Sequence, residues 1–417
     1  MSVTRRKAII GTLAALAGAA HVRAAPYRRR VYIGTFTLTP ESAGDFGGRS
    51  RFSHGIYCFD FDPANGVAGP ISLAAATGSP AHLVAHPNGR FLYACNGQGT
   101  TRDGQNLITA FAIDGALLRP LNSVTCGGRG PSLGVVDRGG RNLLTVNYAS
   151  SSTVCLRLNP DGSLGGRSAL IGNPPSPPGA QPSDSPPPPS PGPAAGPDAD
   201  PLARRPPPLP GVYRTKPHAI VLSESQRFAI AAEIDADRCA VYRFDAMRGS
   251  LQLHQHAASE IGAGPRHLAF HPSYRYLYTA DEAGSSISAW RWDEDLGHLQ
   301  AVQRLPTAPE SVRARNHPSD VRVHPGGEFV YVANRGHGSI AGFRIDPRNG
   351  SLAPLTEVPL DAKSSWSLQI DPGGRWLIAC TQDPDAVRIY AIDSGSGQLR
   401  PTGQVLETIL PTCLTLV

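Results

Sequence analysis

Four ionisable side chains occupy corresponding places in three successive repeats of this chain. His218 and Arg266 each follow a proline that opens a repeat, whereas Glu282 and Arg335 each follow the second strand of one. Two guanidiniums, a carboxylate and an imidazole around one cavity would bind and polarise an oxygen-rich anion.

A purely structural interpretation of these residues is also open. Arg266 and Glu282 could form an ion pair that braces one repeat, with Arg335 solvated. Further polar residues near the same strand ends are candidates for substrate binding: Asp320, Asn147, Tyr148, His82 and Lys216.

Other histidines are interpreted as turn residues. His86, His271 and His324 each recur directly before the proline of a short turn. His267 and His271 have a spacing that metal ligands use, but His271 is one of these turn positions. We expect no metal site and no cofactor.

The unit that positions these residues is clearest in 264–302. It predicts four short strands: 267–271, a Tyr- and Leu-rich run after the turn 271–274, 287–292, and a fourth beginning at 299. Most of the chain repeats this unit, and four strands at a fixed period are typical of a β-propeller.

The repeat openings give the number of units. They are Pro80, Pro131, Pro217, Pro265, Pro318, Ser365 and Pro411, about 46 to 53 residues apart except across one insertion. The last has only PTCLTLV after it, and its missing strands match 31–35 and 55–59 near the N-terminus. We therefore expect an all-β fold over 28–417: a seven-bladed β-propeller with four antiparallel strands per blade, closed by pairing of the N- and C-terminal strands.

Strand direction assigns one face of the ring to function. The short turns 86–90, 271–275 and 324–328 belong to one face, and the starts of first strands and ends of second strands belong to the other. Long loops on one face of a rigid scaffold usually carry function. We expect the site to open there, at the axis.

Two segments fall outside the repeats. Residues 1–25 combine Arg5-Arg6-Lys7 with a short apolar run and a small-residue cleavage pattern. They predict an export signal, of the twin-arginine type, and a periplasmic or secreted protein with no membrane association after cleavage. Residues 173–210 hold 17 of the 40 prolines and predict a disordered insertion.

Composition excludes other classes of function. The net charge is +6, but the basic residues are scattered, so nucleic acid is not an expected partner. Seven cysteines without a CxxC pair predict small buried hydrophobes rather than a redox centre. We expect a monomer.

Several stretches resemble the lactonase family of seven-bladed propellers, which includes propeller-type 6-phosphogluconolactonases and fungal carboxymuconate-lactonising enzymes. They are YIGTFT (32–37), GIYCFDFDPANG (55–66), KPHAIV (216–221), GPRHLAFHP (264–272), ANRGHGSI (333–340) and IDPGGRWLIA (370–379). The residues that act in that family correspond to His218, Arg266, Glu282 and Arg335. A histidine common two places after the first is here Ile220.

The resemblance implies an exported lactonase that hydrolyses a sugar-acid or carboxylated lactone, with His218 or Glu282 as the proton acceptor. No GxSxG motif is present, which disfavours a serine nucleophile. Two alternatives remain: a lactonising cycloisomerase of the muconate type, and a non-catalytic propeller that binds a periplasmic ligand or partner.

Overall fold

The computed structural model describes residues 29–37, 53–97, 106–172 and 215–417. Within these ranges the regular secondary structure is antiparallel strands, apart from short 3-10 helices at Ile234–Ala236 and Glu310–Arg315. The predicted export signal (1–25) and Pro-rich insertion (173–210) lie outside the described residues. No helix in the described ranges is both long and apolar enough to cross a membrane.

Most sheets contain four strands that follow one another in sequence. The first is β5 (Pro80–Ala85), β6 (Phe91–Asn96), β7 (Leu107–Asp114) and β8 (Leu117–Thr125). The second is β9 (Val135–Val136), β10 (Asn142–Asn147), β11 (Ser152–Leu158) and β12 (Leu164–Gly172). The third is β13 (Pro217–Leu222), β14 (Phe228–Glu233), β15 (Arg238–Asp245) and β16 (Ser250–Ala258). The fourth is β17 (Pro265–Phe270), β18 (Tyr276–Asp281), β19 (Ser286–Asp293) and β20 (His298–Pro306).

A larger sheet joins two such units through the single pair Arg335–Ser364. One unit is β21 (His317–Val323), β22 (Phe329–Arg335), β23 (Ser339–Ile345) and β24 (Leu352–Pro359). The other is β25 (Ser364–Ile370), β26 (Trp376–Gln382), β27 (Ala386–Ile392) and β28 (Leu399–Glu407).

The remaining sheet contains both ends of the described chain. Its strands are β29 (Pro411–Leu416), β1 (Arg29–Thr35), β2 (Gly55–Asp62), β3 (Val67–Ala68) and β4 (Ser72–Ala76). β29 pairs with β1 in antiparallel register, with Val31 opposite Leu416 and Ile33 opposite Leu414. The predicted pairing of the terminal strands is therefore present.

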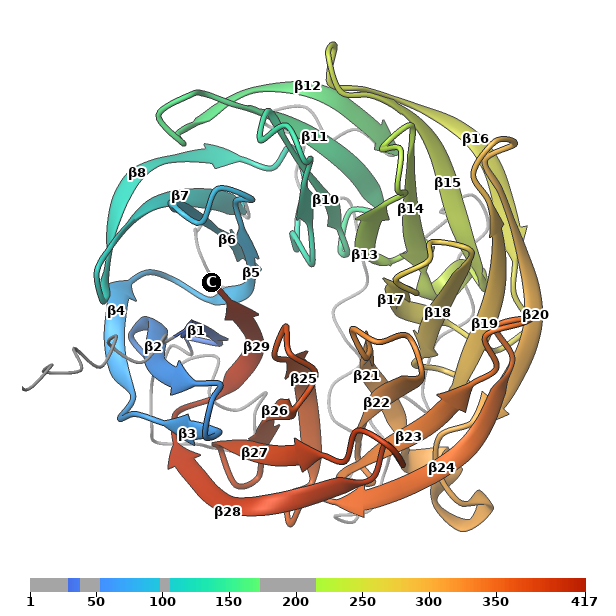
Figure 1. Cartoon of the computed structure of the whole chain (residues 1–417). Coiled ribbons are helices and arrows are strands. Elements are labelled where there is room, and N and C mark those ends of the chain that lie inside the picture. The colour runs from blue at the N-terminus through green and yellow to red at the C-terminus, as the bar shows by residue number, and fades with distance from the viewer. Residues whose placement is uncertain (1–28, 38–52, 98–105, 173–214) are drawn as a thin grey trace, which may run out of the picture.

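The small sheets are arranged as in a propeller, with their first strands toward a common centre and their fourth strands outside (Figure 1). Burial follows this arrangement. All six residues of β6, β10, β14 and β18 are buried, because the second strand of each sheet lies between two neighbouring sheets. The outer strands β8, β16 and β28 expose most of their residues.

The hydrophobic core lies between neighbouring sheets rather than at one centre. One cluster joins Tyr93 of β6 to Leu143 of β10, and another joins Tyr278 of β18 to Val330 of β22. All seven cysteines are buried and free, which confirms their prediction as small hydrophobes.

The recurring histidines connect neighbouring sheets. In each, Nδ1 accepts a backbone N–H within its own turn. The Nε2 atoms lie 3.2, 2.9 and 2.8 Å from carbonyl oxygens of the next sheet, in the pairs His86–Gly140, His271–Gly327 and His324–Gly374. Their interpretation as turn residues is confirmed.

Candidate active site

A β-bulge at the start of the inner strands positions the residues after each opening residue. Pairing with the second strand shifts register at this point in β13, β17 and β25. The bulged residue is His218, Arg266 and Trp366, respectively. A bulge adds a residue without a partner and re-aims side chains, and in β17 it leaves both Arg266 and His267 buried.

Glu282 bridges two arginines directly after β18. Its Oε2 lies 2.8 Å from Nε of Arg266 and 2.9 Å from Nη2 of Arg335. The exposed fractions of the three side chains are 10% for Glu282, 3% for Arg266 and 15% for Arg335. The ion pair between Arg266 and Glu282 that the purely structural interpretation expects is therefore present. Arg335, which that interpretation expects to be solvated, also pairs with Glu282.

The arrangement carries more positive than negative charge. Burial and, after it, the charge of Arg335 together lower the pKa of Arg266 to about 10, although Glu282 acts in the opposite direction. Arg266 is thus protonated at neutral pH. Two guanidiniums against one carboxylate favour the approach of a further anion.

Trp366 supports both arginines from β25. Its ring centroid lies 4.8 Å from Cζ of Arg335 and 6.0 Å from Cζ of Arg266. Guanidiniums at such distances over an indole are stabilised by its π electrons. Trp366 follows the repeat opening Ser365 as Arg266 follows Pro265, but it was not among the predicted site residues because it is not ionisable.

His218 lies in a cluster of imidazoles. Its ring centroid is 5.1 Å from that of His267, 5.4 Å from that of His82 and 5.6 Å from that of the Tyr148 ring. Its Nδ1 is 3.1 Å from Oγ of Ser132, and the residue is partly exposed.

All three imidazoles are neutral at neutral pH. Burial, followed by the charge of Arg266, lowers the pKa of His267 to about 4. Burial is also the largest cause that holds the pKa values of His82 and His218 well below their usual range. Arg266 lowers the pKa of His218 next most, which links the imidazole cluster electrostatically to the arginines.

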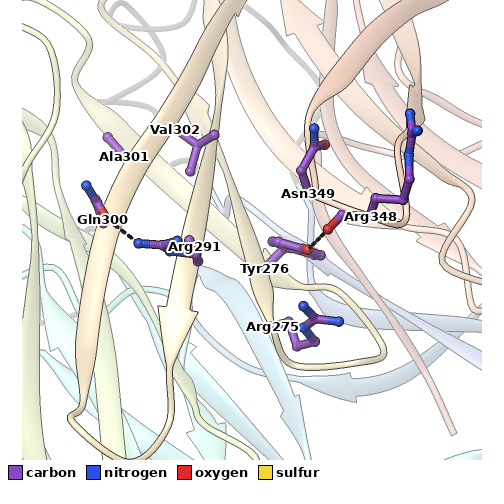
Figure 2. A pocket seen from close by; sticks show the side chains of 8 residues that line it. All are labelled: Arg275, Tyr276, Arg291, Gln300, Ala301, Val302, Arg348 and Asn349. Atoms are coloured by element: carbon purple, nitrogen blue, oxygen red, sulfur yellow. Dashed lines mark hydrogen bonds between the residues drawn. The ribbon is translucent and has the colours of Figure 1, made fainter.

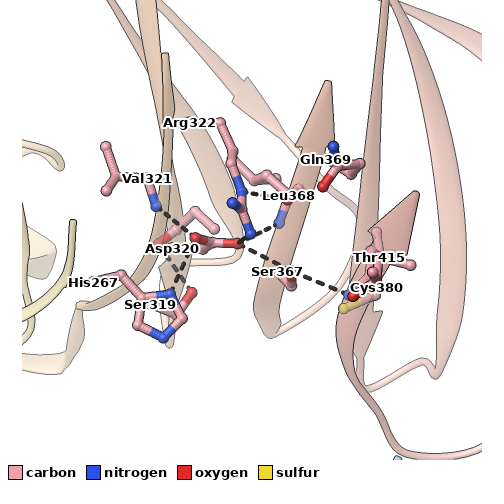
Figure 3. Close-up of polar contacts among 12 residues, drawn as sticks. His267, Ser319, Asp320, Val321, Arg322, Ser367, Leu368, Gln369, Cys380 and Thr415 are labelled. Carbon is pink, nitrogen blue, oxygen red and sulfur yellow. Dashed lines mark hydrogen bonds and ion pairs between the residues drawn. The ribbon is translucent and has the colours of Figure 1, made fainter. Parts of the chain in front are cut away.

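The carboxylate of Asp320 accepts hydrogen bonds from His267 and from other groups of the protein (Figure 3). Its Oδ1 lies 3.0 Å from Nδ1 of His267, and Arg322 Nη2 is 3.1 Å from its Oδ2. Its other donors are Val321 N, Ser367 Oγ and Leu368 N, at 2.9, 3.0 and 2.9 Å. Although burial alone raises it, Arg322 and the bond from His267 bring the pKa of Asp320 below its usual range.

These contacts favour a role for Asp320 in holding His267 rather than in touching substrate. Sequence reasoning considered His267 only as a partner of His271. Its position directly after Arg266 was the signal that could have identified it.

The other second-line candidates differ in their surroundings. Asn147 is fully buried, and its amide donates within the protein, to Cys126 and Ser152. Lys216 Nζ lies 2.8 Å from Oδ2 of Asp235 and 5.7 Å from the centroid of the Tyr148 ring. His82 belongs to the imidazole cluster itself, and Tyr148 adjoins it through an edge-to-face contact with His218.

Two cavities lie elsewhere. One, of about 390 Å³, is lined by Arg275, Tyr276, Arg291, Gln300, Ala301, Val302, Arg348 and Asn349 (Figure 2). Another, of about 400 Å³, adjoins Arg90 and Asp161. Neither is lined by the four candidate residues. Among the described residues, no group of three or more His, Cys, Asp or Glu is arranged to hold a metal ion.

Comparison with known proteins gives a family match over almost the whole described chain. Residues 30–416 match the family model described as lactonase, 7-bladed β-propeller. The chain is 26% identical over 388 residues to the 6-phosphogluconolactonase of Bacillus subtilis, covering 92% of this chain and 97% of that protein.

Solved structures show the same fold. A crystal structure from Bacteroides uniformis is 26% identical, with a TM-score of 0.73, and covers 94% of this chain and 99% of that one. A periplasmic gluconolactonase of Pseudomonas aeruginosa is 23% identical, with a TM-score of 0.76 and the same coverage.

Proposed function

The chain belongs to the lactonase family of seven-bladed β-propellers, and we propose that it hydrolyses an anionic lactone, of a sugar acid or of a carboxylated ring. The 6-phosphogluconolactonase name of its Bacillus subtilis relative supports the reaction class. The substrate class follows from the charges of the candidate site.

The observation that carries the proposal is the pair of guanidiniums, one buried and one partly buried, on one carboxylate. Arg266 and Arg335 lie within 2.9 Å of the same oxygen of Glu282, so two positive charges are held close together and out of bulk water. In a poorly solvated site, fixed donors stabilise developing negative charge without reorganising. They would hold the oxyanion of the tetrahedral intermediate, or a substrate carboxylate or phosphate.

Hydrolysis also requires a proton acceptor for water and a donor for the leaving ring oxygen. His218 and Glu282 are the candidates that sequence reasoning offers. Glu282 Oε2 already lies against both arginines, whereas His218 is neutral and partly exposed. An imidazole therefore suits the acceptor role better than this carboxylate.

A lactone panel tests the proposal. Purified protein would be assayed with glucono-δ-lactone, its 6-phosphate and a carboxylated γ-lactone, with a pH indicator to follow acid release. We expect turnover of an anionic substrate and its loss in Arg335→Ala. The control is Arg348→Ala, since that arginine is 86% exposed and lies in a turn. An inactive wild-type protein on the whole panel would refute the hydrolase and favour the ligand-binding alternative.

We also propose that the ring is closed and has seven blades. The pairing of β29 with β1 and the contacts of β29 with both β25 and β5 support closure. Deleting residues 411–417 should abolish cooperative thermal unfolding, because β29 supplies buried residues such as Leu414. A truncated chain that melts like the full chain would contradict closure.

Export is proposed on sequence alone, since residues 1–25 lie outside the described residues. Replacing both Arg5 and Arg6 with lysine should keep the precursor in the cytoplasm if the twin-arginine route is used. Cell fractionation with N-terminal sequencing of the mature protein measures this. Normal export of the double variant would exclude that route.

A further inference from the structure

The hydrogen bond to Asp320 fixes the tautomer of His267. A carboxylate can only accept, so the 3.0 Å contact requires that Nδ1 of His267 carries the proton. Because the ring is neutral at neutral pH, its Nε2 then has a free lone pair. The ring projects from Asp320 with Nε2 on the far side (Figure 3).

Two buried imidazole nitrogens of this cluster have no hydrogen-bond partner among the described residues. They are Nε2 of His267 and Nδ1 of His82, whose rings are 6.0 Å apart and whose exposed fractions are 4% and 9%. His218 adjoins both rings. Buried polar atoms are nearly always satisfied, and an ordered water normally needs two to four such partners.

We propose that His82, His218 and His267 form the binding site of the hydrolytic water, and that His267 Nε2, held by Asp320, accepts its proton. This inference rests on the proposed lactone hydrolysis. It assigns the proton transfer to a residue outside the four that sequence reasoning selected. Asp320 is a positioning residue, because it acts only through His267.

The bulge in β17 brings the two halves of the reaction together. Arg266 and His267 are consecutive and both buried, so a carbonyl oxygen at the arginines would lie next to a water at the imidazoles. The water oxygen forms a bond to the carbonyl carbon as its proton moves to Nε2, and the carbonyl electron pair becomes the oxyanion. When the intermediate collapses, the ring C–O bond breaks and the proton passes from Nε2 to the departing oxygen. Lactone and water thus give one hydroxy acid.

The charges around His267 favour a ring that is neutral before the reaction and takes up a proton during it. Arg266 on its own strand and Arg322 on β21 lower its pKa, Asp320 opposes them, and His82 and His218 face it as neutral rings. The ring is therefore unprotonated in the resting protein. Negative charge that develops at Arg266 in the transition state offsets the guanidinium and makes Nε2 more basic when it must take the proton.

His267→Asn separates proton transfer from structure. The asparagine amide N–H can replace Nδ1–H as donor to Asp320, but nothing replaces Nε2. We expect kcat about 100- to 10,000-fold below wild type, with KM within about threefold and a nearly unchanged melting temperature. His271→Asn is the matched control, since His271 is a turn residue at the other end of the same strand, and it should keep wild-type kcat.

Two results would overturn the proposal. One is a folded His267→Asn variant with kcat within about threefold of wild type. An inactive wild-type protein is a different outcome, because it would refute lactone hydrolysis itself. The other comes from ¹⁵N NMR of the histidine-labelled wild-type protein, which needs no variant. It should show the Nδ1–H tautomer at His267, with a pKa that matches the acid limb of kcat/KM. The Nε2–H tautomer, or a mismatched pKa, would exclude His267 as the acceptor.

Discussion

Replacing Glu282 with glutamine should destabilise the protein markedly, because the buried Arg266 and the partly buried Arg335 would lose their shared counter-charge. The carboxylate oxygen is 2.8 Å from Arg266 and 2.9 Å from Arg335. At an effective dielectric constant of about 20, each contact represents about 6 kcal/mol of gross Coulomb attraction, most of which offsets desolvation. Removing one partner of such a buried pair costs about 3–5 kcal/mol.

The change is measurable by calorimetry. At about 2 °C per kcal/mol for a long chain, we expect the melting temperature to fall by roughly 6–10 °C. Glu260→Gln is the matched control, because Glu260 is 69% exposed in its ion pair with Arg304 and should change little. A melting temperature for Glu282→Gln within about 2 °C of wild type, or equal losses in both variants, would refute the reasoning.

Two further predictions concern the arginines and the imidazoles. Arg335→Ala should lower kcat for lactone hydrolysis about 100- to 1000-fold with activity of Arg348→Ala unchanged; turnover near wild type would contradict an oxyanion role. Because burial lowers the pKa of His267 to about 4, the unfolded chain binds more protons than the folded one between about pH 6.5 and 4. The free energy of unfolding should therefore fall across that range as pH drops, by about 3 kcal/mol for His267 alone; urea titrations that show a flat profile would contradict it.

Because the chain is built from repeats, the positions of His218 and Arg266 in the candidate site could be predicted from the sequence. His218 and Arg266 occupy the same place relative to an opening proline, and the structure places a bulge at that place in both strands. A local backbone feature that recurs in several blades leaves a recurring sequence signature. Comparing repeats therefore found the strand ends that lie at one face.

The partners across neighbouring blades could not be predicted in the same way. Asp320 on β21 reaches His267 on β17, and Trp366 on β25 lies beneath Arg335. His82 lies beside His267 although 185 residues separate them in the sequence. Hydrophobic periodicity and turn composition are local patterns, so they cannot predict contacts between residues so far apart in the sequence.

The sequence by itself determined the strands, the turns, the repeat and the side chains offered at each inner-strand opening, because these depend on contacts within one blade. Only the tertiary structure decided which of those side chains meet. The rotation from one blade to the next sets how far a side chain reaches over its neighbour, and that rotation comes from packing between whole sheets. The same packing removes water from the imidazoles, and so it also decided that they are neutral.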